Sequence, residues 1–162
     1  MTDSRKKYFS EMYDKHSKAV YGVCLLYLKN KEDAEEAVTE TFIRLMEHTH
    51  KFENNNHEKA YLLKTAVNIC KNLLKSAWKK KVVHDEEVLM YMSTSEEETV
   101  MEEILHLPPK YRVVIYMHYY QGYKAQEISE IMDLSLSAVL SRMSRGREKL
   151  KDIILRGEDF YA

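Results

Sequence analysis

Residues 125–150 read AQEISEIMDLSLSAVLSRMSRGREKL, and their pattern predicts how the C-terminal part of the chain folds. Apolar residues recur at three- and four-residue steps from Ala125 to Met132 and again after Ser135, a spacing typical of amphipathic helices. Ser135 is a good N-cap for the second helix, and Asp133 tolerates the left-handed backbone of a tight turn. Two helices joined by so short a turn, the second one basic, predict a helix-turn-helix motif.

The remaining sequence also has the periodicity of helices. Asn55 is expected to cap one of them, with Glu58 three residues later completing a capping box. Pro109 suits a first helical turn, and Gly122 suits a C-terminal cap. Four glycines and two prolines in 162 residues argue against a turn-rich β fold. We expect helices over about residues 5–28, 32–45, 55–75, 97–106, 109–120, 125–132 and 136–155.

The periodicity fades between Val82 and Glu98, where Ser, Thr and acidic residues are typical of a linker. Three helices can close one core before this stretch, and a new apolar pattern begins after it. The predicted fold class is therefore all-α, with two small helical domains joined by a flexible acidic linker and a helix-turn-helix in the second domain. The predicted boundaries are residues 1–81 for the first domain, 82–97 for the linker and 98–162 for the second domain.

Charge is segregated along the chain, although the net charge is only −1. Seven lysines and no acidic residue lie between Lys59 and Lys81, and eight acidic residues with no lysine or arginine lie between Asp85 and Glu103. Residues 142–156 hold six basic residues against two acidic ones. This pattern is compatible with two DNA-facing surfaces joined by an acidic segment, or with three solvated helix faces.

Several classes of protein are disfavoured by the sequence. It has no Gly-rich phosphate loop, no nucleophile elbow and no HExxH pair, so we expect no enzyme activity and no cofactor. The seven histidines show no convincing ligand spacing, so no metal site is predicted. Cys24 and Cys70 lie inside apolar helical stripes and are expected to be buried free thiols in a reducing compartment. With no signal peptide and no membrane-spanning apolar run, a cytoplasmic protein without membrane insertion is expected.

Five stretches of the chain resemble one family, in the same order and with the same spacing. Residues 107–112, 120–132 and 137–147 are similar to region four of bacterial sigma factors, and residues 33–42 and 61–68 resemble region two. The whole chain is most similar to the compact extracytoplasmic-function (ECF) group, which keeps only these two regions. The resemblance implies an alternative sigma factor that binds core RNA polymerase and directs promoter recognition, DNA opening and transcription initiation.

The resemblance also implies site residues. The last helix would enter the major groove of the upstream (minus-thirty-five) element, and a bidentate Arg145 would discriminate guanine. Trp78 would either stack on a base or pack at a helix end. The implied upstream contacts are Arg112, Lys124, Ser137, Ser141, Arg142, Ser144, Arg145 and Arg147. The implied contacts to the downstream (minus-ten) element are Lys64, Asn68, Lys71, Asn72, Lys75, Trp78, Lys79, Lys80 and Lys81. The implied polymerase contacts are Asp33, Glu36, Thr39 and Glu40.

Some residues depart from the family pattern. Lys124 stands where a capping Ser or Thr is usual, Asp133 replaces a turn Gly, and Thr39 replaces a Gln. Ala138 replaces a Thr, and Leu140 replaces a residue that is often basic or polar. These departures leave the expected fold intact, but they prevent a standard promoter sequence from being carried over to this chain.

The partners implied by the resemblance are promoter DNA and core RNA polymerase, through its β′ clamp helices and β flap, with the protein associated with the nucleoid when in holoenzyme. Sigma factors of this group are also commonly held by an anti-sigma protein. Two alternatives remain open. The chain would act as a stand-alone helix-turn-helix regulator, with residues 5–80 as a sensing or dimerisation domain, or as a sigma-like regulator without initiation activity.

Overall fold

The computed structural model describes residues 2–48, 51–76, 88 and 100–161, with side chains in the last helix described to residue 156. The chain divides into two compact units, residues 1–80 and 81–162, and every described element is an α-helix. The predicted all-α class with two helical domains is therefore confirmed. The predicted linker lies outside the described residues except for Val88, which is buried.

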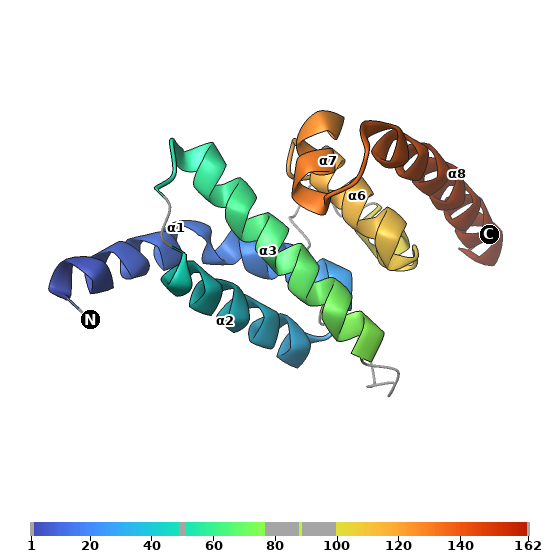
Figure 1. Ribbon diagram of the computed structural model, residues 1–162. Coiled ribbons are helices and arrows are strands. Elements are labelled where there is room, and N and C mark those ends of the chain that lie inside the picture. The colour runs from blue at the N-terminus through green and yellow to red at the C-terminus, as the bar shows by residue number, and fades with distance from the viewer. Residues whose placement is uncertain (1, 49–50, 77–87, 89–99, 162) are drawn as a thin grey trace. The chain divides into compact units, whose positions relative to one another are not determined.

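The first unit is a three-helix core in which each helix packs against the other two (Figure 1). Its apolar centre includes Leu26, Leu45, Leu62 and Leu63, contributed by all three helices. Burial of such side chains is the main stabilising term, about 1.5–3 kcal/mol for each fully buried leucine. The helices are α1 (Asp3–Leu28), α2 (Lys31–Glu47) and α3 (Asn55–Ser76).

The two cysteines lie in this core. Cys24 on α1 and Cys70 on α3 are both buried and free, as the sequence predicted. A hydrogen bond between the two side chains, together with burial, raises the pKa of Cys70. Cys70 is therefore held as a thiol, which is a poor nucleophile and a poor metal ligand.

A short polar break separates α1 from α2. Lys29 adopts the left-handed conformation (φ 53°), and its N–H donates to the Leu25 carbonyl at 2.7 Å. Asn30 then caps α2, because its side-chain oxygen accepts the Asp33 N–H at 2.9 Å. The sequence predicted this break.

The start of α3 differs from the predicted one. Asn54, not Asn55, is the cap, and its side-chain oxygen accepts the His57 N–H at 2.9 Å. Glu58 therefore lies one position too far into the helix to complete a capping box. Its carboxylate instead binds the Lys15 ammonium at 2.9 Å and lies 3.0 Å from the buried His16 ring. The predicted capping box is wrong because Glu58 is used to hold α3 against α1.

The second unit contains the predicted helix-turn-helix. The helix α6 is buried over its whole middle, and the helices α5 and α7 and the first half of α8 pack around it. The C-cap of α6 is Tyr120 and not Gly122 as predicted, although Gly122, two residues later, has a left-handed backbone (φ +74°) in the loop before α7. Of the helix predicted over residues 97–106, the structure describes only Met101–Leu105 as helical. The helices are α5 (Met101–Leu105), α6 (Pro109–Tyr119), α7 (Ala125–Met132) and α8 (Leu136–Tyr161).

Gly146 allows a close approach between α8 and α6. A Cβ atom at this position would lie 2.9 Å from Cγ1 and 3.1 Å from Cδ1 of Ile115. The contact fixes how α8 lies on the second unit, and therefore which of its residues face solvent.

Candidate nucleic-acid interface

The turn between α7 and α8 has the geometry predicted for it. Asp133 adopts the left-handed conformation (φ 55°), and the Leu134 N–H donates to the Ser129 carbonyl at 2.9 Å. Ser135 caps α8, since its hydroxyl oxygen accepts the Ala138 N–H at 3.1 Å. The aspartate thus performs the backbone task of the usual glycine, and its departure from the family pattern leaves the turn intact.

Lys124 immediately precedes α7 and is exposed. Its own N–H donates to Glu127 Oε1 at 2.9 Å, which is one half of a capping box. A lysine side chain has no acceptor and cannot supply the other half. The ammonium therefore remains available at the edge of the helix-turn-helix.

The helix α8 has a clear inner and outer face over its first three turns. Val139 and Met143 are buried with Gly146 against the rest of the unit, while Arg142 is half-buried. The outer face carries short hydroxyl side chains and two leucines. The exposed residues are Leu136, Ser137, Leu140, Ser141 and Ser144, followed by Arg145 and Arg147.

Two arginines beyond the serines interact with tyrosines of α6. Arg147 Nη1 donates to the Tyr119 hydroxyl at 3.2 Å. Burial raises the pKa of Tyr111, but a hydrogen bond from Arg145 and the charge of Lys110 outweigh this effect and lower the pKa overall. The Lys110 ammonium also lies 5.0 Å from the centre of the Tyr111 ring. These contacts restrict the two guanidinium groups and concentrate positive charge at this end of the outer face.

Arg112 does not lie on this surface, and its predicted role as a DNA backbone contact is contradicted. The side chain is buried, with only 4% of its surface exposed. Its Nη1 donates to the Leu107 carbonyl at 2.8 Å and to the Leu105 carbonyl at 3.4 Å. The guanidinium thus satisfies the carbonyl of Leu105, the last residue of α5, and that of Leu107, two residues beyond it, and neither has a partner within that helix.

The predicted downstream contacts of α3 share one face of that helix, because they recur at spacings of three, four and seven residues. Lys64, Asn72 and Lys75 are exposed, and Asn68 and Lys71 are half-buried. In Figure 1 this helix runs uninterrupted along the first unit. The remaining members of the predicted set lie outside the described residues. They are Trp78, Lys79, Lys80 and Lys81.

The predicted polymerase contacts lie on α2, away from the three-helix core. Glu36 and Thr39 are exposed, and Asp33 and Glu40 are half-buried. Glu40 also accepts a hydrogen bond from Arg44 Nε at 3.3 Å, one turn further along.

Ile43 was missed by the sequence reasoning. It lies one turn beyond Thr39 and is 43% exposed, although the apolar residues on either side of it, Phe42 and Leu45, are buried. An apolar residue out of register with the inner face of α2 was the available signal. The outer face of α2 thus combines carboxylates with an apolar side chain.

A second missed feature is a group of aromatic rings at the end of α2 and the start of α3. The rings of His48 and Phe52 stack with centroids 5.1 Å apart, and Tyr61 lies 4.3 Å from His48. His57 meets Phe52 edge to face at 5.3 Å. These contacts hold both ends of the connection between the two helices.

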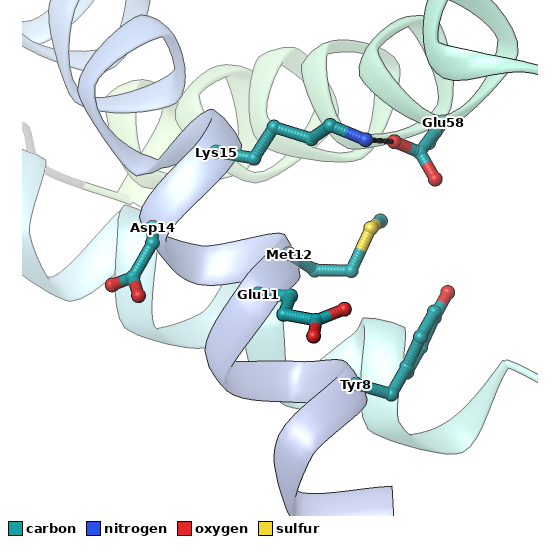
Figure 2. Close-up of a pocket in the computed structure, with 6 residues that line it drawn as sticks. All are labelled: Tyr8, Glu11, Met12, Asp14, Lys15 and Glu58. Carbon is teal, nitrogen blue, oxygen red and sulfur yellow. Dashed lines mark hydrogen bonds and ion pairs between the residues drawn. The ribbon is translucent and has the colours of Figure 1, made fainter.

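An acidic hollow of about 540 Å³ lies between the first half of α1 and the start of α3. Figure 2 shows the Lys15–Glu58 ion pair at one end of it and the Tyr8 ring at the other. Partial burial raises the pKa of Glu58, but hydrogen bonds from Lys15 and His16 outweigh it and lower the pKa overall. The Glu58 carboxylate is therefore charged and paired, which is a structural arrangement and requires no ligand.

Two family profiles match the chain. One is described as Sigma-70 region 2 and matches residues 12–80, and the other is described as Sigma-70, region 4 and matches residues 97–150. Together they span both helical units. The chain therefore belongs to the sigma-70 family of RNA polymerase sigma factors, in its ECF group. Family membership indicates a DNA-recognition protein.

Curated sigma factors are similar in sequence to this chain over most of their length. The chain is 28% identical to the ECF RNA polymerase sigma factor SigW of Bacillus subtilis, covering 88% of this chain and 87% of that protein. It is 27% identical to RNA polymerase sigma factor SigV of the same organism, covering 89% of each chain.

Solved structures show the same fold. CnrH, determined in complex with the cytosolic domain of CnrY, aligns with a TM-score of 0.68 at 19% identity, over 92% of this chain and 88% of that one. The sigma factor RpoE of Bartonella quintana, determined with the anti-sigma factor NepR, aligns with a TM-score of 0.65 at 14% identity, over 94% and 98%. Among the described helices, none has the length and apolar character needed to traverse a bilayer.

Proposed function

We propose that this chain is an alternative sigma factor whose two units divide the work of promoter recognition between them. It joins core RNA polymerase, directs it to promoters and starts transcription there. The observation that carries this function is the pair of separate helical units, matched in order by sigma regions two and four. We also propose that the chain has no catalytic activity or cofactor of its own and works in the cytoplasm, on the nucleoid when in holoenzyme.

The outer face of α8 would read the upstream element. Ser137, Ser141 and Ser144 are exposed, and their hydroxyls can either donate to or accept from base edges. Arg145 was expected to read a guanine, but its hydrogen bond to Tyr111 keeps it at the border of this face, so it would instead hold a phosphate oxygen on the flank. Arg147, bonded to the Tyr119 hydroxyl, and Lys124 would also hold phosphate oxygens. The half-buried Arg142 would contact phosphate only with the outer end of its side chain. Arg112 is excluded from this set because it is buried.

The polar face of α3 would hold the downstream element. Lys64 and Lys75 are exposed cations and would neutralise phosphates of the opened strand. Asn68 and Asn72 offer both a donor and an acceptor, so they would contact bases or sugars between those lysines. Lys71, Trp78 and Lys79 to Lys81 extend the same proposal toward the end of the unit.

The outer face of α2 would dock on the β′ clamp helices. Glu36 and Glu40 supply negative charge that would orient docking on a basic partner helix. Thr39 and Asp33 lie on the same side of α2, and Ile43 would add apolar contact area one turn beyond Thr39. An apolar residue ringed by polar ones is a common composition for such a contact. The second unit would contact the β flap.

An anti-sigma protein is a further proposed partner. The similar sigma factor RpoE was solved with the anti-sigma factor NepR, and the similar CnrH was solved with the cytosolic domain of CnrY. A protein of this class that covers α2 or α8 would block polymerase or promoter binding directly.

The decisive experiment is run-off transcription with purified core polymerase and a library of promoter fragments. We expect specific transcripts when the chain is added, and none with core enzyme alone. Glu36→Lys should weaken polymerase binding at least tenfold, while Lys31→Glu, a charge reversal of the same size at the exposed start of α2, should have less effect. If the chain binds an operator as a dimer and never associates with polymerase, it is a stand-alone regulator and this proposal is wrong.

A further inference from the structure

Two leucines are exposed on the outer face of α8, among serines and arginines. Leu136 is 42% exposed and Leu140 is 49% exposed. They lie four residues apart, so one stands directly above the other on the helix surface, and Ser144 continues the same row. In Figure 1 these first turns of α8 follow directly on α7 in the second unit.

Packing does not explain the two leucines. The inner face of α8 is already filled by Val139 and Met143, and Gly146 brings the helix close to α6. Single exposed leucines are common on protein surfaces and need no explanation. A pair at the start of the second helix of a helix-turn-helix is different, because this is the part of the motif that meets base edges. Leucine is also longer than the neighbouring serines, so it would reach the base edges first.

We propose that Leu140, supported by Leu136, is a specificity-determining residue that contacts the C5-methyl group of a thymine in the upstream promoter element. This proposal rests on the proposed function. Thymine presents an apolar methyl group in the major groove, whereas cytosine presents an amino donor and guanine two acceptors. A leucine placed against those polar groups would bury them without a hydrogen-bond partner, so the same contact that favours thymine disfavours the other bases.

The charge around the leucines favours DNA over a protein as the partner. Arg147 lies on the same side of α8 two turns beyond Leu140, and Arg145 lies on the opposite flank of the outer face. Both guanidinium groups interact with tyrosines of α6, which keeps them at the border of this surface. An apolar row with cations beside it is complementary to a base edge between two phosphate backbones.

The test uses holoenzyme, assembled from the full chain and core RNA polymerase, and promoters with a randomised upstream element. After selection of the preferred element, each thymine in it is replaced in turn by deoxyuridine, which removes only the methyl group. We expect one thymine at which open-complex formation falls about threefold to fivefold, the effect of losing one buried methyl group. Leu140→Ala should bring the thymine-to-uracil ratio at that position close to one, and Leu136→Ala should reduce it partly.

Leu155→Ala is the matched control, because Leu155 is on the same helix and is 48% exposed. It should leave the ratio unchanged. A wild-type protein that is indifferent to every thymine methyl group, or a Leu140→Ala variant that keeps the wild-type ratio, overturns the proposal. If Leu140→Ala keeps the ratio and instead weakens binding to core polymerase, the leucines contact protein. If the holoenzyme selects no upstream element at all, the proposed function fails, and this inference fails with it.

Discussion

Replacing Arg112 by Met separates a structural role from a DNA-binding role. Methionine keeps an unbranched stem of similar size in the buried site but removes every donor of the guanidinium. The bond to the Leu107 carbonyl, at 2.8 Å, is short and charge-assisted, whereas the bond to the Leu105 carbonyl, at 3.4 Å, is long and weak. The variant therefore loses one strong hydrogen bond and leaves a carbonyl unsatisfied next to the core.

The expected loss of stability can be worked out from these contacts. A hydrogen bond from a charged donor contributes about 1.5–3 kcal/mol, and removing a charge from a buried site returns part of that. We expect the second unit to lose about 2 kcal/mol of unfolding free energy in Arg112→Met. For a unit of this size the melting temperature should fall by roughly 8–16 °C.

The assay is thermal unfolding followed by circular dichroism, with hydrogen exchange and mass spectrometry to assign the change to the second unit. Arg145→Met is the matched control, since it makes the same chemical change at an exposed position. It removes only a solvent-exposed hydrogen bond to Tyr111, so its unfolding free energy should fall by at most about 1 kcal/mol, less than in Arg112→Met. The salt dependence of promoter binding should fall by about one phosphate contact. The reasoning is refuted if Arg112→Met melts with the wild type and loses promoter binding as strongly as Arg145→Met does.

Three further predictions follow from the packing and the charges. Gly146→Ala should destabilise the second unit by up to about 2 kcal/mol. The clash with Ile115 costs about 1–3 kcal/mol, whereas the gain in helix propensity is about 1 kcal/mol. Urea unfolding measures this loss of unfolding free energy. Glu58→Gln should destabilise the first unit by about 1 kcal/mol at neutral pH. Because the folded pKa of Glu58 is lowered from its ordinary value of 4.5, this stabilisation is present above that pH and is lost as pH falls through the folded pKa, which a series of unfolding curves from pH 7 to pH 3 would follow. Replacing Lys64 and Lys75 together by Gln should reduce the slope of log binding constant against log salt by about 1.4 for single-stranded contacts, measured on holoenzyme and promoter DNA.

For each of these three predictions, one experimental result would contradict it. A Gly146→Ala variant more stable than the wild type would show that Ile115 moves aside without cost. A stability difference for Glu58→Gln that persists unchanged to pH 3 would mean that its charge contributes nothing to holding α3 on α1. An unchanged salt slope in the lysine variant, compared with Lys18→Gln on the exposed side of α1, would remove α3 from the DNA interface.

The helix-turn-helix could be predicted closely because its signals are local. The apolar spacing of α7, the left-handed Asp133 and the cap at Ser135 all depend on residues within one or two turns of each other. The start of α3 could not be placed as well. Residues 54–56 are three consecutive asparagines, and local capping rules do not choose between the first two. The use of Asn54 as the cap goes together with the tertiary contact of Glu58 with Lys15 and His16, and sequence spacing does not reveal this contact.

Arg112 was misplaced for a related reason. An arginine just inside a helix of a DNA-binding motif suggests a phosphate contact, and the chain alone does not show which carbonyls lie nearby. The sequence nevertheless indicated that Arg112 is buried, because residues 111–117 form an apolar run in which this arginine is the one charged side chain. Every residue of that run is buried. A charged residue inside such a run is better read as a satisfied core group than as a surface contact.

The position of Arg112 in the core, and not on the proposed DNA surface, also affects how strongly the chain would bind DNA. A protein of net charge −1 has little general attraction for DNA, so its affinity depends on a few cations on each unit. Of the cationic contacts proposed for the upstream element, Arg145, Arg147, part of Arg142 and Lys124 remain, and each unit alone would neutralise only a few phosphates. Binding through so few contacts is weak at physiological salt. When polymerase fixes both units on one promoter, the second contact becomes intramolecular and its effective concentration rises. Promoter binding therefore depends more on polymerase when each unit has fewer cations to contact DNA. The burial of Arg112 removes one such cation from the second unit and so increases this dependence on polymerase.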